Sequence, residues 1–188
     1  MLRAVLSTTA IVLCVSSLAF ACADDGSQMP PAQLVSQYQT ALKDATTPDE
    51  RAELARAYAI SLTDRDRLVL ARTLAAGTRQ DDAVFGAGLL VDAGQLKEAA
   101  PVFARFVTDG GDMTAHFWKW MHGADPKTAT RAYIAIARAL LARIDTLTGE
   151  RRRAAEAFLL DPGYGPRIET YSRKAVEAKL SALEREIK

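Results

Sequence analysis

Residues 82–109 read DAVFGAGLLVDAGQLKEAAPVFARFVTD, two apolar runs that are separated by Gly94. Apolar and small residues recur at three- and four-residue steps on both sides of this glycine, which is the spacing of helices buried on one face. We therefore expect helices at 80–92 and 95–108. A connection this short makes consecutive helices antiparallel neighbours. The stretch predicts a helical hairpin.

The helical spacing extends over nearly all of the chain after residue 30, and no stretch alternates as a β-strand would. We expect an all-α chain of about nine antiparallel helices, arranged as a short irregular α-solenoid or as a helical bundle. The expected helices are 31–45, 48–62, 64–76, 80–92, 95–108, 112–122, 126–147, 150–160 and 166–187. The clearest apolar face is that of 126–147, and its members are Ala129, Tyr133, Ile136, Leu140, Ile144 and Leu147.

Several helix boundaries are predicted by end-capping residues. Thr47-Pro48-Asp49-Glu50 has the composition of a capping box, with proline at the first helical position. Asp125-Pro126 repeats the combination of cap and proline. Asp81-Asp82 are interpreted as first-turn acids that complement the helix dipole. Left-handed glycines are expected to end helices at Gly77, Gly94, Gly123 and Gly149.

Residues 82–109 resemble one HEAT repeat, with a helix of small residues, a glycine turn, Ala99-Ala100-Pro101 and a closing Asp109. The second half of the stretch is similar to the second helix of a tetratricopeptide repeat. The matching positions in that half are Gly94, Leu96, Ala99, Phe103 and Phe106. The resemblance implies a short, irregular solenoid whose exposed face binds another macromolecule.

The first 21 residues have the pattern of a secretory signal peptide. Arg3 is the only charged residue before an apolar run, Ala4 to Phe20, and Ala19-Phe20-Ala21 fits the small-x-small pattern of a cleavage site. We therefore expect a cleaved signal peptide at 1–21, a flexible segment at 22–30 and a single helical domain at 31–188. The protein is expected to be periplasmic or secreted.

Two alternatives concern the residues at the cleavage site. Cleavage after Ala23 would leave a mature chain without cysteine, because Cys14 lies inside the signal peptide. Alternatively, Cys22 is lipidated, since the small Ala21 precedes it as in bacterial lipoproteins; this is the only membrane attachment that we expect. In every case the mature chain has at most one cysteine and so no internal disulfide.

Charge and helix pattern limit the possible partners. The chain carries 24 Lys and Arg against 23 Asp and Glu, and loss of Arg3 with the signal peptide leaves 23 against 23. This balance excludes the basic surface that is typical of a nucleic-acid-binding protein. The expected helix 166–187 has a narrow apolar seam that fits ordinary packing or a homodimer. That seam consists of Val176, Leu180, Leu183 and Ile187.

Residues 112–122 hold both tryptophans and both histidines of the chain. Trp118, Trp120 and His122 fit either a plug between hairpins or a partner-binding patch, because tryptophan is frequent at interface hot spots. Tyr164, in a loop of glycines and prolines, is a further candidate contact. His116 and His122 are six residues apart, which points their rings away from each other, so we expect no metal and no cofactor.

We find no recognisable catalytic motif. The favoured hypothesis is a non-enzymatic, exported helical-repeat protein that binds another protein in the cell envelope, for example an immunity-type inhibitor of a toxin. One alternative is a lipoprotein adaptor anchored through Cys22. Another is a small enzyme with His116 as general base and Asp112 as its orienting carboxylate.

Overall fold

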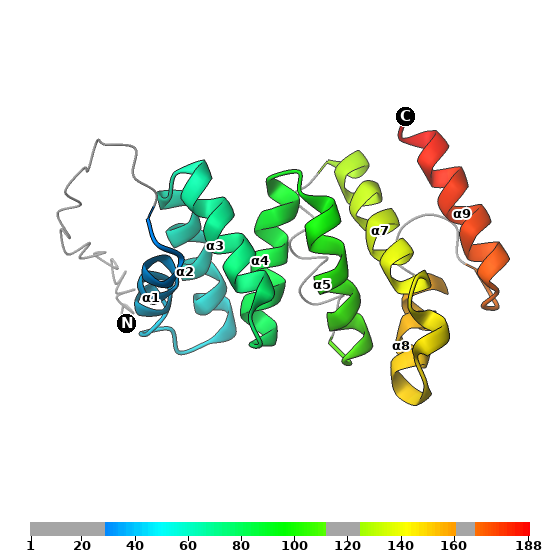
Figure 1. The fold of residues 1–188 in the computed structure, drawn as a ribbon, viewed down its shortest axis with the longest axis horizontal. Coiled ribbons are helices and arrows are strands. Elements are labelled where there is room, and N and C mark those ends of the chain that lie inside the picture. Colours follow the sequence, from blue (N-terminus) through cyan, green and yellow to red (C-terminus); the bar gives the residue numbers. More distant parts are fainter. Residues whose placement is uncertain (1–28, 112–124, 161–167) are drawn as a thin grey trace, which may run out of the picture.

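The computed structural model describes residues 29–111, 125–160 and 168–188, and the regular structure in these ranges is entirely helical. The prediction of an all-α fold is confirmed (Figure 1). The expected helix at 112–122 lies outside the described residues. The described helices are α1 (Pro31–Ala41), α2 (Pro48–Ser61), α3 (Asp64–Ala76), α4 (Gln80–Asp92), α5 (Leu96–Thr108), α7 (Pro126–Leu141), α8 (Gly149–Leu160) and α9 (Arg173–Glu186), with a 3-10 turn, η1 (Ile144–Thr146).

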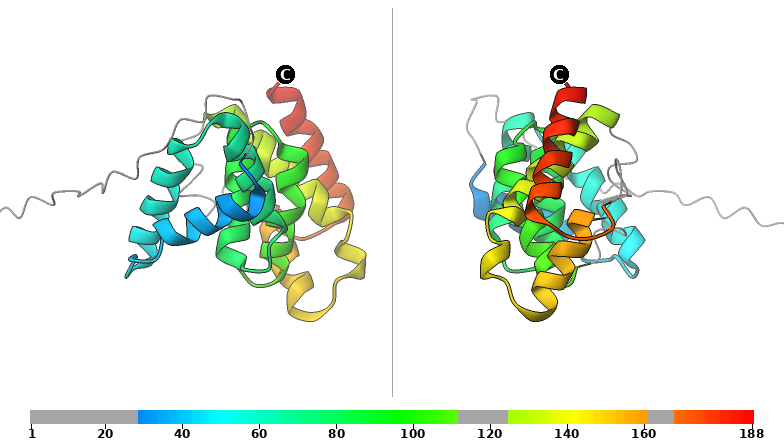
Figure 2. Two further views of the ribbon diagram at one scale, coloured as in Figure 1. Left: turned by 60° about the vertical axis from the view of Figure 1, so that its left-hand side comes forward. Right: turned by 90° about the vertical axis from the view of Figure 1, so that its right-hand side faces the viewer.

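The helices stand in a row, and the middle helices pack on those next to them, whereas α1, α8 and α9 also contact helices further along the sequence. α3 packs on α4, α4 on α5, and α5 on α7, while α1 packs on α2 and α3. α9 packs on α7 and ends the row, and α8 lies against α5 and α7. The right-hand view of Figure 2 looks along the row from the end formed by α9, which lies in front of the other helices. α1 and α9 therefore lie at opposite ends of the molecule.

A continuous apolar core runs along the row and contains the face that the sequence indicates for 126–147. All six members of that face are buried. The core continues through Leu34 and Tyr38 of α1, Leu70 of α3, Leu90 of α4 and Phe103 of α5. The strongest periodicity in the sequence thus corresponds to residues that are buried against several neighbouring helices.

The predicted caps form at two helix starts. The Thr47 side chain accepts a hydrogen bond from the Glu50 N–H, and the Glu50 carboxylate accepts one from the Thr47 N–H, which completes the capping box of α2. Asp125 accepts from two backbone N–H groups at the start of α7.

The predicted left-handed glycines are confirmed in part. Gly94 has a φ of 74° and follows the end of α4, as predicted. Gly149 also has a positive φ, 57°, but it is the first residue of α8 and ends no helix, because α7 already stops at Leu141. The Gln95 N–H donates to the Leu90 carbonyl at 2.7 Å, which closes the end of α4. The prediction for Gly77 was wrong, because its φ is −69° and α3 ends there in an extended residue. Gly123 lies outside the described residues.

The expected helix 126–147 is interrupted, and this corrects the sequence prediction. α7 ends at Leu141, Arg143 leaves the helical conformation at φ −121°, and a 3-10 turn follows. Ile144 and Leu147 are nevertheless buried. The apolar spacing therefore continues past the helix end, because burial selects apolar residues whether or not the backbone stays helical.

Two other helices are shorter than the sequence predicts. α9 begins at Arg173 and not at 166, because the Ser172 side chain caps it by accepting from the Ala175 N–H at 3.1 Å. α1 ends at Ala41 and not at 45, where the Lys43 N–H donates to the Thr40 carbonyl in a tighter, 3-10-type turn.

The apolar seam of the last helix is used for packing within the chain. Val176, Leu180 and Leu183 are buried, and α9 packs on α7. A homodimer through 166–187 stays a prediction.

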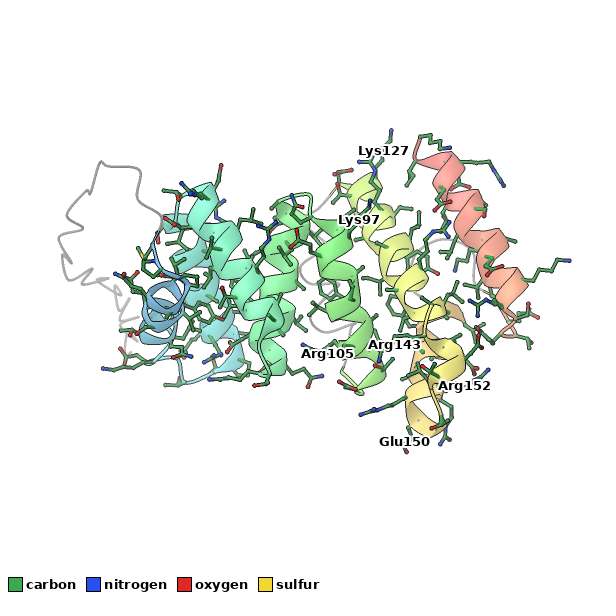
Figure 3. The ribbon with its side chains drawn as sticks, in the orientation of Figure 1. Lys97, Arg105, Lys127, Arg143, Glu150 and Arg152 are labelled. Atoms are coloured by element: carbon green, nitrogen blue, oxygen red, sulfur yellow. The ribbon has the colours of Figure 1, made fainter. Side chains whose placement is uncertain are left out.

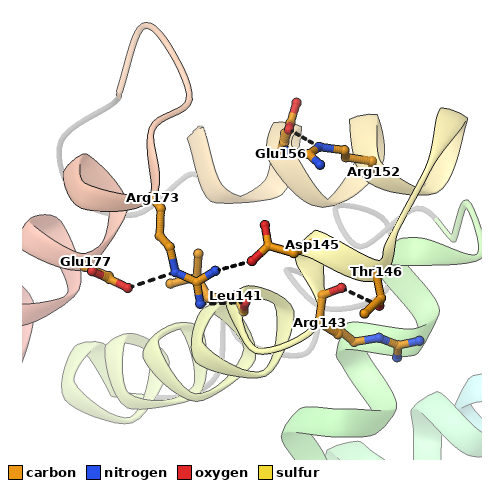
Figure 4. Close-up of polar contacts among 8 residues, drawn as sticks. All are labelled: Leu141, Arg143, Asp145, Thr146, Arg152, Glu156, Arg173 and Glu177. Carbon is orange, nitrogen blue, oxygen red and sulfur yellow. Dashed lines mark hydrogen bonds and ion pairs between the residues drawn. The ribbon is translucent and has the colours of Figure 1, made fainter.

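An arginine at the start of α9 ties this helix to the end of α7. Figure 4 shows Arg173 between Asp145 and Glu177, and the Nη1–Oδ2 distance to Asp145 is 2.7 Å. Its Nη2 also donates to the Leu141 carbonyl at 3.2 Å, one of the carbonyls that the end of α7 leaves without a helical partner.

Candidate functional site

The residues that the sequence singles out for function lie outside the described ranges. These residues are Cys22, His116, Trp118, Trp120, His122 and Tyr164. In the ranges that are described, no helix is long and apolar enough to cross a membrane. The described side chains also include no group of three or more His, Cys, Asp or Glu that could hold a metal ion. We therefore searched the described surface for a site of another kind.

A cleft of about 360 Å³ opens between α2 and α4. Ala52, Ala55 and Ala59 form its α2 side. Val84, Phe85 and Leu89 belong to its α4 side, and Tyr38 of α1 and Phe103 of α5 also line it. The cleft is therefore mainly apolar, and its volume is within the range of about 300–1,000 Å³ that is usual for ligand pockets.

The cleft exists because α2 is short of bulky side chains and packs chiefly on α1. Only Ala55 and Ala59 of α2 are buried, and neither extends beyond Cβ. Tyr58, in the last turn of α2, fixes this helix to α1, with its hydroxyl 3.2 Å from the Leu34 carbonyl oxygen. α2 thus forms one wall of the cleft without filling the space in front of α4.

A buried carboxylate closes the cleft at the N-terminal ends of α2 and α4. Asp82 is only 5% exposed, and its Oδ1 accepts from Arg51 Nη2 at 3.0 Å and from the Tyr38 hydroxyl at 3.1 Å. Arg79 Nε lies 3.2 Å from the other carboxylate oxygen. A buried charge needs such partners, because the loss of hydration is otherwise uncompensated. Asp82 therefore links α1, α2 and α4 through a single carboxylate.

The Tyr38 hydroxyl is fixed as a hydrogen-bond donor. Burial, followed by the adjacent Asp82 charge, raises the pKa of Tyr38 well above its ordinary value. The ring also stacks on Phe85, with 5.9 Å between centroids and 17° between planes. At neutral pH the phenol is protonated, so its hydroxyl can donate to Asp82 and the cluster holds the helices together.

An arginine from α3 holds the other end of α2. Arg67 Nε donates to the Ala59 carbonyl at 2.8 Å, and its Nη2 donates to the Leu62 carbonyl at 3.0 Å. These carbonyls belong to the last turn of α2 and the residue after it, where helical partners run out. α2 is thus fixed at both ends by arginines, and the apolar cleft lies between the two contacts.

The rim of the cleft combines an exposed apolar side chain with unpaired charges. Ile60 is 75% exposed and is the one large apolar side chain so exposed among the described residues. Arg56 of α2 and Asp81 of α4 line the same cleft, and neither forms an ion pair with a described residue. An apolar floor with a polar rim is the usual anatomy of a binding site.

The sequence missed most of this site. Asp81 and Asp82 lie in the first turn of α4 as interpreted, but the buried contacts of Asp82 with Tyr38 and Arg51 were not foreseen. A run of alanines in α2 is a weak signal, because alanine is also the best helix former. The exposed Ile60 at the helix end was the one local signal that could have been followed.

Comparison with protein-family models, with curated proteins and with solved structures found no match to this chain.

Proposed function

We propose that this protein is a non-enzymatic, exported binding protein that holds an apolar side chain of a protein partner in the cleft between α2 and α4. The supporting observation is the cleft itself, an apolar hollow between the alanine face of α2 and α4 with Ile60 exposed at its edge. An exposed apolar residue beside a hollow is favourable for binding, because a partner can bury both together.

The size of the cleft suits a small number of anchor side chains. Complete burial of one aliphatic or aromatic side chain contributes about 1.5–3 kcal/mol. Ile60 would contribute in the same way when it is covered by the partner. Arg56 and Asp81 would contribute little free energy at the rim but would select a partner of complementary charge.

We expect the encounter in the cell envelope or outside the cell, because the first 21 residues have the pattern of a signal peptide. An immunity-type inhibitor that occludes a toxin is one specific form of the proposal, and a small helical body without a recognisable catalytic motif suits it.

The first experiment is an affinity pull-down from the envelope fraction with a matched pair of variants. Ala52 lines the cleft and Ala57 does not, although both are exposed residues of α2. We expect Ala52→Phe to fill the cleft and weaken binding of the captured partner at least about tenfold, or 1.4 kcal/mol. Ala57→Phe should bind as the wild type does. Equal binding by both variants, with unchanged circular dichroism, would contradict the role of the cleft.

The aromatic segment is a second proposed contact. We expect Trp118→Ala or Trp120→Ala to weaken binding of the same partner by about 2 kcal/mol or more, because tryptophans contribute much of the binding free energy in many interfaces. The measurement is titration calorimetry together with circular dichroism. If fold and binding were lost together, the tryptophan in question would be a core residue.

A further inference from the structure

A second hollow lies in the other half of the molecule, where α5, α7 and α9 meet. It is a groove of about 480 Å³ between the first turns of α5, the middle of α7 and the C-terminal end of α9. It shares no lining residue with the cleft between α2 and α4. The groove is therefore a separate surface.

The floor of the groove is apolar and partly open to solvent. Leu96 and Pro101 come from α5, Ala135 and Ala139 from α7, and Ile187 from the end of α9. All five are exposed or half-buried. Proline inside a helix presents no N–H and adds an apolar ring to the surface, while the Lys97 carbonyl loses its helical donor. The floor can accept apolar side chains without leaving a buried donor unpaired.

The rim of the groove is cationic. Lys97 of α5 and Arg131 of α7 line it, and neither forms an ion pair with a described residue. Arg138 is the third cation, and it is paired with Glu184, with 2.6 Å between Nη2 and Oε1. Lys127 is exposed one turn before Arg131, and Figure 3 labels it at the N-terminal end of α7.

The two halves of the chain also differ in charge. Residues 29–92 contain 7 Lys and Arg against 9 Asp and Glu, whereas residues 93–188 contain 16 against 12. The net charge of the chain is therefore close to zero although the half that contains the groove has an excess of positive charge. Unpaired cations at its rim favour an anionic partner over short distances, within a Debye length of about 10 Å.

We propose that this groove binds an acidic, apolar segment of a partner protein, beyond the function proposed for the cleft. Apolar side chains of the segment would cover Leu96, Pro101 and Ile187. Its carboxylates would lie against Lys97 and Arg131. Lys97 and Arg131, which form no ion pair with a described residue, lie at the rim of an apolar floor, although the pKa of Asp125 is lowered by its hydrogen bonds to Thr128 and, less, by the nearby charge of Arg131. This arrangement matches such a segment better than a nucleic acid, which requires many phosphate contacts and gains little from aliphatic surface.

The test uses two synthetic helical peptides with the same leucine stripe. One carries glutamate on both flanks of the stripe, and the other carries lysine at the same positions. We expect the full chain to bind the glutamate peptide in fluorescence anisotropy and to bind the lysine peptide at least about tenfold more weakly. Raising the salt from about 0.05 M to about 0.5 M should weaken the complex, because exposed charges are screened.

Variants of the groove make the test specific. The double variant Lys97→Glu with Arg131→Glu should bind the glutamate peptide at least about tenfold more weakly than the wild type does. Ala139→Phe should also weaken binding of this peptide, because the new ring would occupy the floor of the groove. The matched control is Lys43→Glu with Lys174→Glu, which reverses two exposed cations outside the groove and should bind as the wild type does.

Three results would overturn the proposal. The first is no binding of the glutamate peptide, and the second is an equal loss in the groove and control variants. The third is binding of vesicles of phosphatidylglycerol and phosphatidylethanolamine, with the same dependence on Lys97 and Arg131, in place of the peptide. That third result would assign the groove to an anionic membrane surface.

Discussion

Two buried tyrosines have opposite hydrogen-bonding situations. Tyr38 donates to Asp82, so its hydroxyl compensates a buried charge. The hydroxyl of Tyr133, in α7, is buried and has no hydrogen-bond partner among the described residues. Its ring packs near Phe158, with 5.8 Å between centroids. Removing a polar group that has a partner should cost stability, whereas removing one that has none should not.

The first prediction compares the phenylalanine variants of these two tyrosines. Tyr38→Phe should lower the free energy of unfolding by about 1–3 kcal/mol, because Asp82 loses a donor while it stays buried. Tyr133→Phe should be neutral or should raise that free energy by up to about 1 kcal/mol. Urea denaturation at pH 7 measures both. A clear destabilisation by Tyr133→Phe would mean that its hydroxyl has a partner beyond the described residues.

The second prediction concerns alkaline pH. Burial raises the pKa of Tyr133 from 10.0 to about 12. Between these values the native state holds a proton that the unfolded state has lost, so stability is full below pH 10 and decreases as the pH rises toward 12. In this range Tyr133→Phe should make the free energy of unfolding decrease less steeply with pH, by up to about 1.4 kcal/mol per pH unit. The measurement is the midpoint of urea unfolding at several pH values, for the wild type and for Tyr133→Phe. Parallel curves for Tyr133→Phe and the wild type would contradict this.

At the scale of elements, Gly86 sets the distance between α3 and α4. A Cβ at this position would lie 2.6 Å from the Ala71 carbonyl oxygen and 2.7 Å from the Ala75 nitrogen. These are backbone atoms of α3, so the neighbour cannot move aside without shifting the whole helix.

The third prediction is that Gly86→Ala destabilises the protein by about 1–3 kcal/mol, as overpacked cores do. The sign is informative, because glycine to alanine inside a helix ordinarily stabilises by about 0.5–1 kcal/mol. Gly86→Val should cost more than Gly86→Ala, and thermal unfolding measures both. Stabilisation by Gly86→Ala would show that α3 and α4 can separate without loss.

The sequence predicts the interior of these helices better than their ends. Helices 64–76 and 80–92 are found with the predicted bounds, although Gly77 ends the first of them in an extended and not a left-handed conformation. The prediction failed after Leu141, where Ile144 and Leu147 keep the helical spacing although the backbone turns. The spacing of apolar residues indicates which side chains are buried. It does not indicate where α7 ends, because that depends on how α9 and η1 pack on α7.

The candidate site was less predictable, since it depends on residues that are distant in sequence. Tyr38 and Asp82 are 44 positions apart and on different helices. The cleft itself depends on the separation between α2 and α4, and this separation cannot be inferred from the amino-acid composition.

At the scale of the whole molecule, the row of helices predicts that disturbances stay local. In a stack whose units contact mainly their neighbours, stability is a sum of local units and interfaces. A closed bundle would share one core and unfold as a whole. The two arrangements can be separated by loosening one end of the molecule and observing the other.

Arg173 is the residue with which to loosen the end formed by α9, because it binds Asp145, Glu177 and the Leu141 carbonyl at once (Figure 4). We expect Arg173→Ala to speed amide hydrogen exchange in α9 and the last turn of α7. Exchange in α1 to α4 should be unchanged, because opening of one unit need not open the others.

Arg143→Ala is the matched control for this fourth prediction, since the Arg143 side chain is exposed and forms no ion pair with a described residue. It should leave exchange in α9 as in the wild type. A uniform increase along the chain in Arg173→Ala would instead show one cooperative core. The helical-repeat interpretation would then be wrong, and the cleft and the groove would be coupled through that core, so that a ligand at one would alter exchange at the other.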